Sequence, residues 1–181
     1  MFLQDGFTNI CANNTTLSHV KQPWPEEGII DLLVQRSSGQ FIYAATVPKF
    51  VGTDFRSSTK LLAFVLKSDP TAFLDLDQLY TQILSVYPSE VNIAQVLGFI
   101  IAFNENHSPE LIEDILGMEE GELKLVLCGL SSLMKDEKKE RLNEGVISYV
   151  IPHFAHASFS DYLFNSKFES LGPIPCQSTG I

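Results

Sequence analysis

The sequence predicts a mostly α-helical protein, in which a helical bundle is followed by a winged-helix domain with a small β-wing. Two observations lead to this fold class. Apolar residues recur at helical spacing over most of the chain, and capping or helix-breaking residues divide that pattern into short segments. One segment, Val146–Ile151, alternates instead like a β-strand. In a winged helix, helices are followed by a turn and then by strands, which is the order of elements predicted here.

Length and composition are those of a folded protein. The chain has 181 residues, of which 45% are hydrophobic and 19% are charged, whereas disordered chains have less apolar and more charged content. We expect a disordered extension over residues 1–20, which are polar and contain Asn13–Thr16. A helical domain over 21–87, a winged-helix domain over 88–165 and a tail over 166–181 should follow.

Four segments of the helical domain carry helix signals. The first should begin with Pro25 as its first helical residue and end at Ser37–Gly39, with Gly39 in the left-handed conformation. Pro48 lies in the second segment, residues 40–51, where it should cause a kink or an early end. The third segment runs from Ser57 or Ser58 to Lys67. The fourth begins at Asp75, which forms a capping-box pattern with Gln78.

Three helices and a strand are predicted in the winged-helix domain. The first covers residues 90–103. The second is capped by Ser108, has Pro109 at its first position and ends at Gly117. The third covers Glu119–Met134, and after a turn at 143–145 the chain enters the strand at Val146.

Charge is strongly acidic and unevenly distributed. The formal net charge is −10, and Glu105–Glu122 contains seven acidic residues and no basic one. This balance argues against nucleic acid and anionic membranes as partners, because both require a basic face. The acidic stretch is either a docking face for a basic partner or, as is common, a solvated helix surface. One basic cluster is present, at Lys135–Arg141, and acidic residues dilute it.

Cysteine usage and hydropathy favour a cytoplasmic, reducing environment. Cys11, Cys128 and Cys176 are odd in number and widely spaced, so they form neither a disulfide framework nor a zinc motif. The N-terminus lacks the apolar core of a secretory signal. The longest apolar run, Val96–Phe103, is too short to cross a bilayer.

The segment Phe154–Leu163 places one histidine, His156, just before a helix start. Ser158 is positioned to cap the helix that follows, and Asp161 falls in its first turn. A zinc site built from His153, His156 and Asp161 lacks a fourth ligand. A catalytic triad of His156, Ser158 and Asp161 is disfavoured, because side chains two and three residues apart do not easily line up.

Two further candidate sites have simpler explanations. Asp75 and Asp77 could form a carboxylate pair, but they lie on different faces of one helix, so capping explains them better. The helix from Glu119 could read DNA, but Glu119, Glu120 and Glu122 would meet phosphates. Packing against protein is the preferred interpretation of that helix.

Five short segments, at residues 39–47, 76–84, 115–117, 130–133 and 154–163, carry a family resemblance. Together they resemble the helical and winged-helix domains of NACHT-type STAND nucleotide switches from mushroom-forming fungi. Residues 154–163 resemble the family pattern His-x-Ser-Phe-x-Asp-Phe-Leu, and residues 39–47 resemble Gly-Leu-Phe-Ile-Tyr-Ala-Ser-Thr-Val. Residues 76–84 are similar to Leu-Asp-x-Leu-Tyr-x-Gln-Ile-Leu. Residues 115–117 and 130–133 follow in family order, so the resemblance covers about residues 23–165.

The resemblance implies a signal-transduction protein that binds ATP or ADP and in which His156 senses the nucleotide phosphate. No phosphate loop is present, since the chain contains no Gly-Lys dipeptide. The chain alone is therefore expected to have no cofactor, no metal and no enzymatic activity. The resemblance implies a non-catalytic regulatory fragment of such a switch. The alternatives are a stand-alone helical adaptor with an acidic docking face, or an inert gene fragment.

The partner implied is a protein, or the missing nucleotide-binding domain. Without that domain, apolar surface should be uncovered around Phe41–Tyr43 and around Phe154 and Phe159, so the chain could self-associate. His156 should lie at the rim of this surface, partly accessible to solvent.

Overall fold

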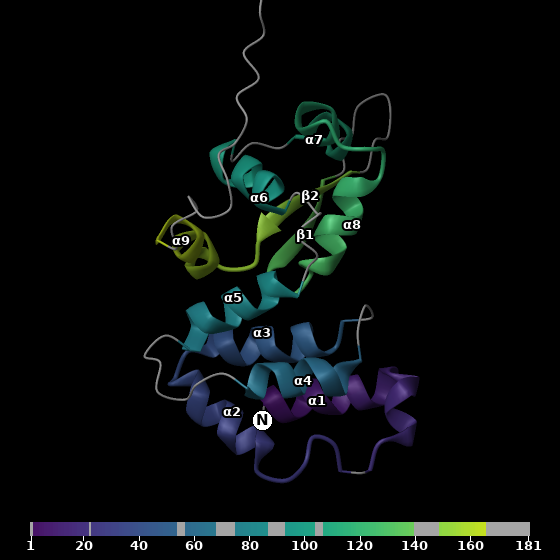
Figure 1. The fold of residues 1–181 in the computed structure, drawn as a ribbon, viewed down its shortest axis with the longest axis vertical. Helices are drawn as coiled ribbons and strands as arrows, with labels where there is room; N and C mark the ends of the chain where they lie inside the picture. The colour runs from purple at the N-terminus through teal and green to yellow at the C-terminus, as the bar shows by residue number, and fades with distance from the viewer. Residues whose placement is uncertain are drawn as a thin grey trace, which may run out of the picture. The chain divides into compact units, whose positions relative to one another are not determined.

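A computed structural model describes residues 2–21, 23–53, 57–67, 75–86, 93–103, 107–139 and 149–165. Over these residues the chain is mostly helical and has one two-stranded sheet, which confirms the predicted mostly α-helical class (Figure 1). The chain divides into two compact units. The first contains Met1–Tyr87 and Gly129–Leu133, and the second contains Pro88–Cys128 and Met134–Ile181.

Helices make up the first unit in the described ranges. They are α1 (Phe2–Asn13), the 3-10 helix η1 (Thr15–His19), α2 (Ile29–Ser37), α3 (Phe41–Val51), α4 (Ser58–Leu66) and α5 (Asp75–Ser85). α3 contacts α1, α2, α4 and α5, so it is the central helix of this unit. The predicted third and fourth segments correspond to α4 and α5.

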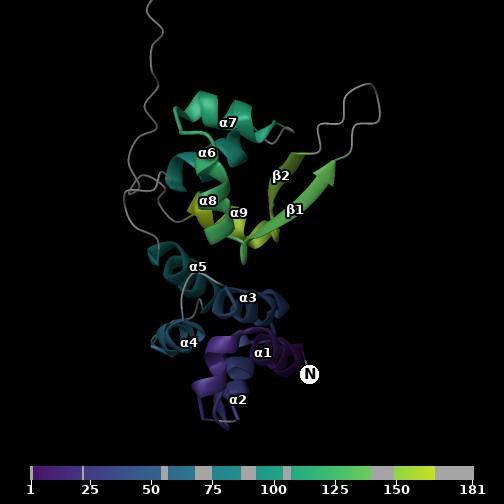
Figure 2. The same ribbon diagram turned by 90° about the vertical axis from the view of Figure 1, so that its right-hand side faces the viewer.

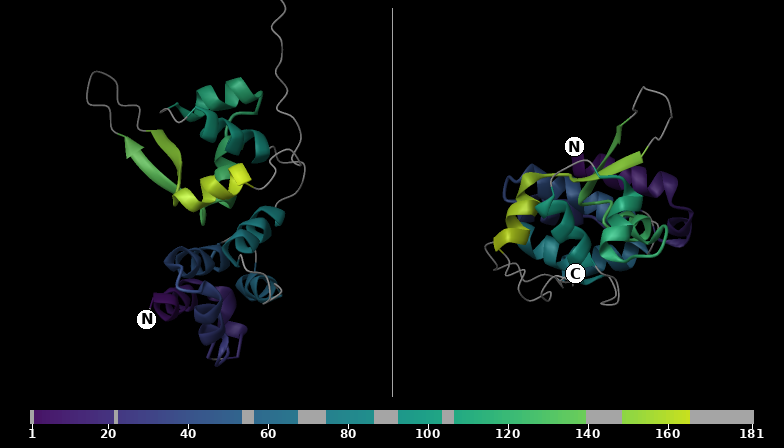
Figure 3. Two further views of the ribbon diagram at one scale, coloured as in Figure 1. Left: turned by 90° about the vertical axis from the view of Figure 1, so that its left-hand side faces the viewer. Right: turned by 90° about the horizontal axis from the view of Figure 1, so that it is seen from above.

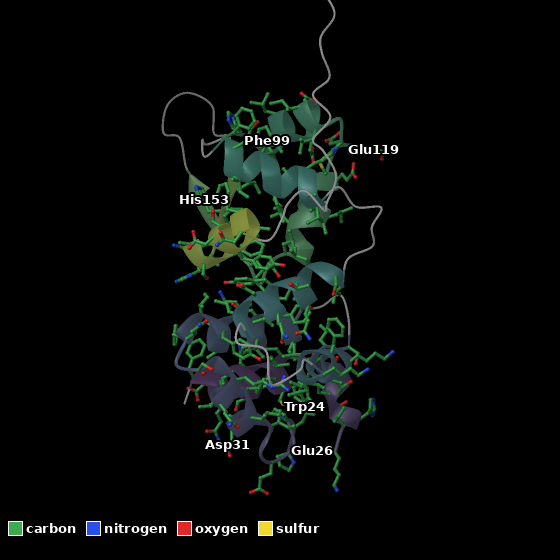
Figure 4. The ribbon with its side chains drawn as sticks, turned by 60° about the vertical axis from the view of Figure 1, so that its left-hand side comes forward. Trp24, Glu26, Asp31, Phe99, Glu119 and His153 are labelled. Carbon is green, nitrogen blue, oxygen red and sulfur yellow. The ribbon has the colours of Figure 1, made fainter. Side chains whose placement is uncertain are left out.

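The predicted disordered extension over residues 1–20 is wrong in its described part. α1 covers Phe2–Asn13, and its side chains Leu3, Phe7 and Ile10 are buried. These residues are four and three positions apart, which places them on one helix face. Phe7 packs edge-on against Trp24 with ring centroids 5.6 Å apart (Figure 4). The surrounding polar residues conceal this stripe in the sequence.

The start of α2 also differs from the prediction. Pro25 follows a cis peptide bond and lies outside any helix, and α2 begins at Ile29 after Gly28, whose φ of 87° is left-handed. A helical segment cannot include such a residue, so Gly28 sets the boundary. At the other end both Ser38 and Gly39 are left-handed, with φ of 47° and 80°.

Pro48 does not end α3 early, because the helix continues to Val51. The proline costs one backbone hydrogen bond within the helix. Its ring is buried and lies directly against α1 at Gly6. The proline therefore acts as a packing residue between α1 and α3.

The second unit contains α6 (Ile93–Ala102), α7 (Pro109–Leu116), β1 (Met134–Lys139), β2 (Tyr149–Phe154), α9 (Ala157–Asn165) and most of α8 (Glu122–Gly129). β1 and β2 pair antiparallel, with Met134 opposite Phe154 and Lys139 opposite Tyr149 (Figure 2). The helix predicted over Glu119–Met134 is shorter than expected, since it ends at Gly129 and Met134 opens β1. α9 follows directly after β2 (Figure 3).

Several predictions fall outside the described residues: the turn at 143–145, the first residues of the predicted strand, Arg141, Cys176 and the tail over 166–181.

Across the described ranges, the helices are too short or too polar to pass through a bilayer.

Candidate functional site

His156 lies in the short connection between β2 and α9. β2 ends at Phe154, and α9 begins at Ala157. On the strand, His153 is paired in register with Lys135 of β1 (Figure 4). The antiparallel ladder thus fixes the backbone on one side of His156, and the first turn of α9 fixes it on the other.

An aromatic cluster anchors this connection. The Phe159 ring packs edge-on against Phe154 at 5.3 Å and lies nearly parallel to Tyr162 at 6.2 Å. Phe159 and Leu163, four residues apart, are each only 1% exposed. The prediction of an uncovered apolar surface around Phe154 and Phe159 is therefore wrong for Phe159. Phe154 itself is half-buried.

The N-terminal cap of α9 is His156, not Ser158 as predicted. The Ser158 backbone N–H donates to His156 Nδ1 at 3.1 Å, and the Phe159 N–H donates to the His156 carbonyl at 3.2 Å. Nδ1 is as many bonds from the backbone as the side-chain oxygen of Asn or Asp, the usual acceptors at this position. The imidazole therefore replaces the expected serine as the capping group.

This cap fixes the tautomer of His156. A backbone N–H can only donate, so Nδ1 must carry a lone pair. The Ser158 hydroxyl, 2.7 Å from Nδ1, then donates to the same atom. In the neutral ring the proton is on Nε2. His156 is exposed, and the hydrogen bonds of its ring within the described chain involve Nδ1 alone. Nε2–H is therefore accessible as a donor, beside the N-terminus of α9.

A metal site and a catalytic triad built on His156 find less support. Among the described residues no three His, Cys, Asp or Glu side chains gather in a way that could hold a metal ion. Contrary to the sequence argument, Ser158 and His156 do lie within hydrogen-bond distance. However, the Nδ1 lone pair that a general base would use already accepts the Ser158 backbone N–H, and no hydrogen bond joins Asp161 to the ring in the described residues.

The predicted apolar surface at the start of α3 is present in part. Phe41 is 65% exposed, Ile42 is half-buried and Tyr43 is buried. Phe41 meets the exposed Phe2 of α1 edge-on, with ring centroids 4.9 Å apart. An exposed aromatic pair therefore connects the start of α1 to the start of α3.

An open groove of about 470 Å³ runs between α1 and α3. It is lined by Phe2, Asp5, Gly6, Asn9, Ile10, Asn13, Asn14, Ala45, Pro48, Lys49 and Gly52. The Asn13 amide donates to Asn9 at 2.7 Å, and the Asn14 amide donates to the Ser58 hydroxyl at 3.0 Å. No motif in the sequence pointed to this groove, because it depends on how closely the two helices approach.

The candidate DNA-reading helix is α8, and its N-terminus is acidic. Glu119 and Glu120 are exposed in the preceding turn (Figure 4). The Glu122 carboxylate accepts the Glu119 backbone N–H at 2.9 Å, and so closes the turn before the helix. Lys124 is the one basic residue within α8.

The candidate carboxylate pair at the start of α5 stays untested, because the Asp75 side chain lies outside the described part of the structure. Burial raises the pKa of Asp77.

Comparisons of the chain with models of protein families, with curated proteins and with solved structures find no significant match. The resemblance to NACHT-type switches therefore rests on the sequence segments alone.

Proposed function

We propose that this chain is a non-catalytic regulatory module of a NACHT-type STAND switch, which acts through intramolecular or protein–protein contacts. The observation that carries the proposal is the state of His156. Its ring is exposed, its Nδ1 is held by the cap of α9, and its Nε2–H is accessible to a group from outside the described chain. A residue that senses a phosphate held by another domain needs these three properties.

The order of elements in the second unit supports a winged-helix domain. Three helices, α6, α7 and α8, precede the antiparallel pair β1 and β2, and α9 follows. In this proposal β1 and β2 form the wing. The described helices of the first unit form the helical domain.

A nucleotide is proposed to reach His156 only with a second domain. The sequence has no phosphate loop, so neither its backbone cradle nor its lysine is present. The Nε2–H of His156 would donate to a phosphate oxygen of ADP or ATP held by that domain. The positive end of the α9 dipole, next to His156, would favour the same negative charge.

The test is binding of the chain to a separately expressed nucleotide-binding domain. The probe is the ADP-loaded domain of a NACHT protein from a mushroom-forming fungus, titrated by calorimetry. We expect saturable binding, and a loss of about tenfold in affinity for His156→Asn, which keeps the α9 cap but moves the donor. His19→Asn, at an exposed histidine of η1, is the matched control and should leave affinity unchanged.

A second calorimetric titration uses ADP alone as the ligand. The chain without the added domain should give no heat of ADP binding at micromolar concentrations. Saturable binding of free ADP would contradict the proposal, as would equal affinities of the domain for the wild type and His156→Asn. A salt-sensitive gel shift with duplex DNA would instead favour a nucleic-acid function for α8.

A further inference from the structure

The outward face of α7 combines an acidic edge with an apolar edge. Glu110, Leu111, Asp114 and Ile115 are all exposed, and Leu111 and Ile115 keep 43% and 55% of their surface accessible. At about 100° of rotation per residue, the two acids lie within about 40° of each other, and so do the two aliphatic residues. The two pairs are adjacent, so α7 presents two parallel stripes to solvent.

The opposite face of α7 is fixed to the rest of the second unit. Ile112 and Glu113 are buried, and α7 contacts α6 and β2. The Glu113 carboxylate accepts the Leu123 backbone N–H of α8 at 3.0 Å, in a buried position. This hydrogen bond satisfies a donor at the N-terminus of α8 and joins the two helices.

Both ends of α7 are capped as well. The Leu111 N–H donates to the Ser108 hydroxyl at 3.3 Å, and Gly117 adopts a left-handed φ of 65° at the C-terminal end. A helix of eight residues would not be stable alone, so these contacts determine its structure. The two stripes are therefore held on a rigid helix, which lowers the entropic cost of binding a partner.

We propose that this face of α7 is a docking surface for a basic amphipathic helix of a partner protein. Leu111 and Ile115 would pack between aliphatic side chains of that helix, and Glu110 and Asp114 would face its lysines or arginines. The aliphatic pair has the one-turn spacing by which helices pack ridge into groove. This surface is separate from His156 and does not depend on its role.

Charge selects this occupant over others. Anionic membranes and nucleic acid would be repelled by Glu110 and Asp114, which have no basic partner among the described residues. A second copy bound symmetrically through this face would place the same acidic edges together. An extended peptide gains its affinity from a free sheet edge, which a helix surface does not offer.

The test uses a synthetic amphipathic peptide of leucine and lysine, about 18 residues long, as the probe. Titration is followed in ¹H–¹⁵N spectra of the full chain and by calorimetry at two salt concentrations. We expect shifts centred on residues 110–115 and a Kd on the order of 10 μM, because the surface is small. Leu111→Gln with Ile115→Gln should weaken binding at least about tenfold. Glu110→Lys with Asp114→Lys should weaken it and remove most of its salt dependence.

Matched controls are present on the first unit. Glu26→Lys with Asp31→Lys changes the net charge by the same amount at exposed positions of the first unit (Figure 4). Val34→Gln with Phe41→Gln removes an exposed apolar pair. Both control variants should bind like the wild type, as should His156→Asn. Circular dichroism establishes that each variant is folded.

Four results would overturn the proposal: no binding at low salt, shifts spread over the whole chain, equal weakening by the control variants, or equal binding of an analogue with glutamate in place of lysine. A dimer or binding to anionic vesicles that the Leu111→Gln and Ile115→Gln changes abolish would also overturn it, by assigning the face to another occupant. Because His156→Asn does not touch this surface, the present proposal and the proposed function can fail independently.

Discussion

Gly6 of α1 lies directly against the ring of Pro48 in α3. A β-carbon at position 6 would come within 2.8 Å of Pro48 Cβ and 2.9 Å of Pro48 Cγ. Such separations are well below van der Waals contact, so the two helices approach each other as closely as they do only because residue 6 has no side chain. The groove between α1 and α3, which both residues line, depends on this approach.

We predict that Gly6→Ala destabilises the first unit by about 1–2 kcal/mol. Overpacking against the rigid proline ring costs about 1–3 kcal/mol, and the higher helix propensity of alanine returns up to about 1 kcal/mol. Urea denaturation of the wild type and of Gly6→Ala measures the difference in unfolding free energy. In a Pro48→Ala background the Cγ contact is absent and only the Cβ contact remains, so the same change should cost less. Equal costs in the two backgrounds would show that the Cγ contact is not the cause.

Local rules predicted the elements whose ends depend on their own residues. α7 has the cap at Ser108, the proline at its first position and the left-handed Gly117 that the sequence indicated. The starts of α4 and α5 were predicted within a residue, although the Ser57 side chain makes no capping hydrogen bond to α4. For α7 the N-terminal cap is complete within four consecutive residues.

Elements that depend on distant residues were missed. α1 is stabilised by burial of Leu3, Phe7 and Ile10, and Phe7 packs against Trp24. Its polar positions resemble a loose terminus until that packing is known. The shortening of α8 depends on the pairing of Met134 with Phe154, some 20 residues away by number. Propensity alone does not separate the end of an apolar helix from the start of a strand.

At the candidate site, position was predictable and chemistry was not. The sequence identified His156 and its helix, and the ring is exposed as the prediction required. The cap was assigned to Ser158 because serine is common at helix starts and histidine is not. The direction in which the His156 ring points decides which residue caps α9, and this direction is a property of the folded turn.

Arg36 provides a second test of distant contacts, and we predict that Arg36→Met destabilises the first unit by about 2–3 kcal/mol. The buried guanidinium of α2 donates to the carbonyls of Val65 and Leu66, at 3.0 Å and 3.1 Å, at the end of α4. Bonds from a charged donor to the last carbonyls of a helix are strong, and the charge favours the helix dipole. The unfolding free energy of Arg36→Lys should fall between those of the wild type and Arg36→Met. Lys60→Met, at an exposed position of α4, should change the unfolding free energy little.

The cysteines should differ in reactivity. Burial raises the pKa of Cys11, and its thiol donates to the Trp24 carbonyl at 3.3 Å, whereas Cys128 is exposed. A raised pKa means a smaller thiolate fraction at a given pH, and the thiolate is the reactive form. With iodoacetamide at about pH 8, Cys128 should react at least about tenfold faster than Cys11. Peptide mass spectrometry follows the alkylation of both cysteines, and equal rates would contradict the partial burial of Cys11. Unfolding the protein in guanidinium chloride should abolish the difference between the two reaction rates.

Substitutions of His156 should separate its capping role from its donor role. His156→Ala removes the acceptor for the Ser158 N–H and should cost about 1 kcal/mol, whereas His156→Asn supplies an oxygen at the same position and should cost less. Long-range ¹H–¹⁵N spectra of the wild type should show the neutral ring with its proton on Nε2, because Nδ1 accepts from the backbone. A proton on Nδ1 would contradict the cap. If His156→Asn preserves the unfolding free energy yet loses affinity for the nucleotide-binding domain, then the exposed Nε2–H, and not the stability of α9, is what that partner recognises.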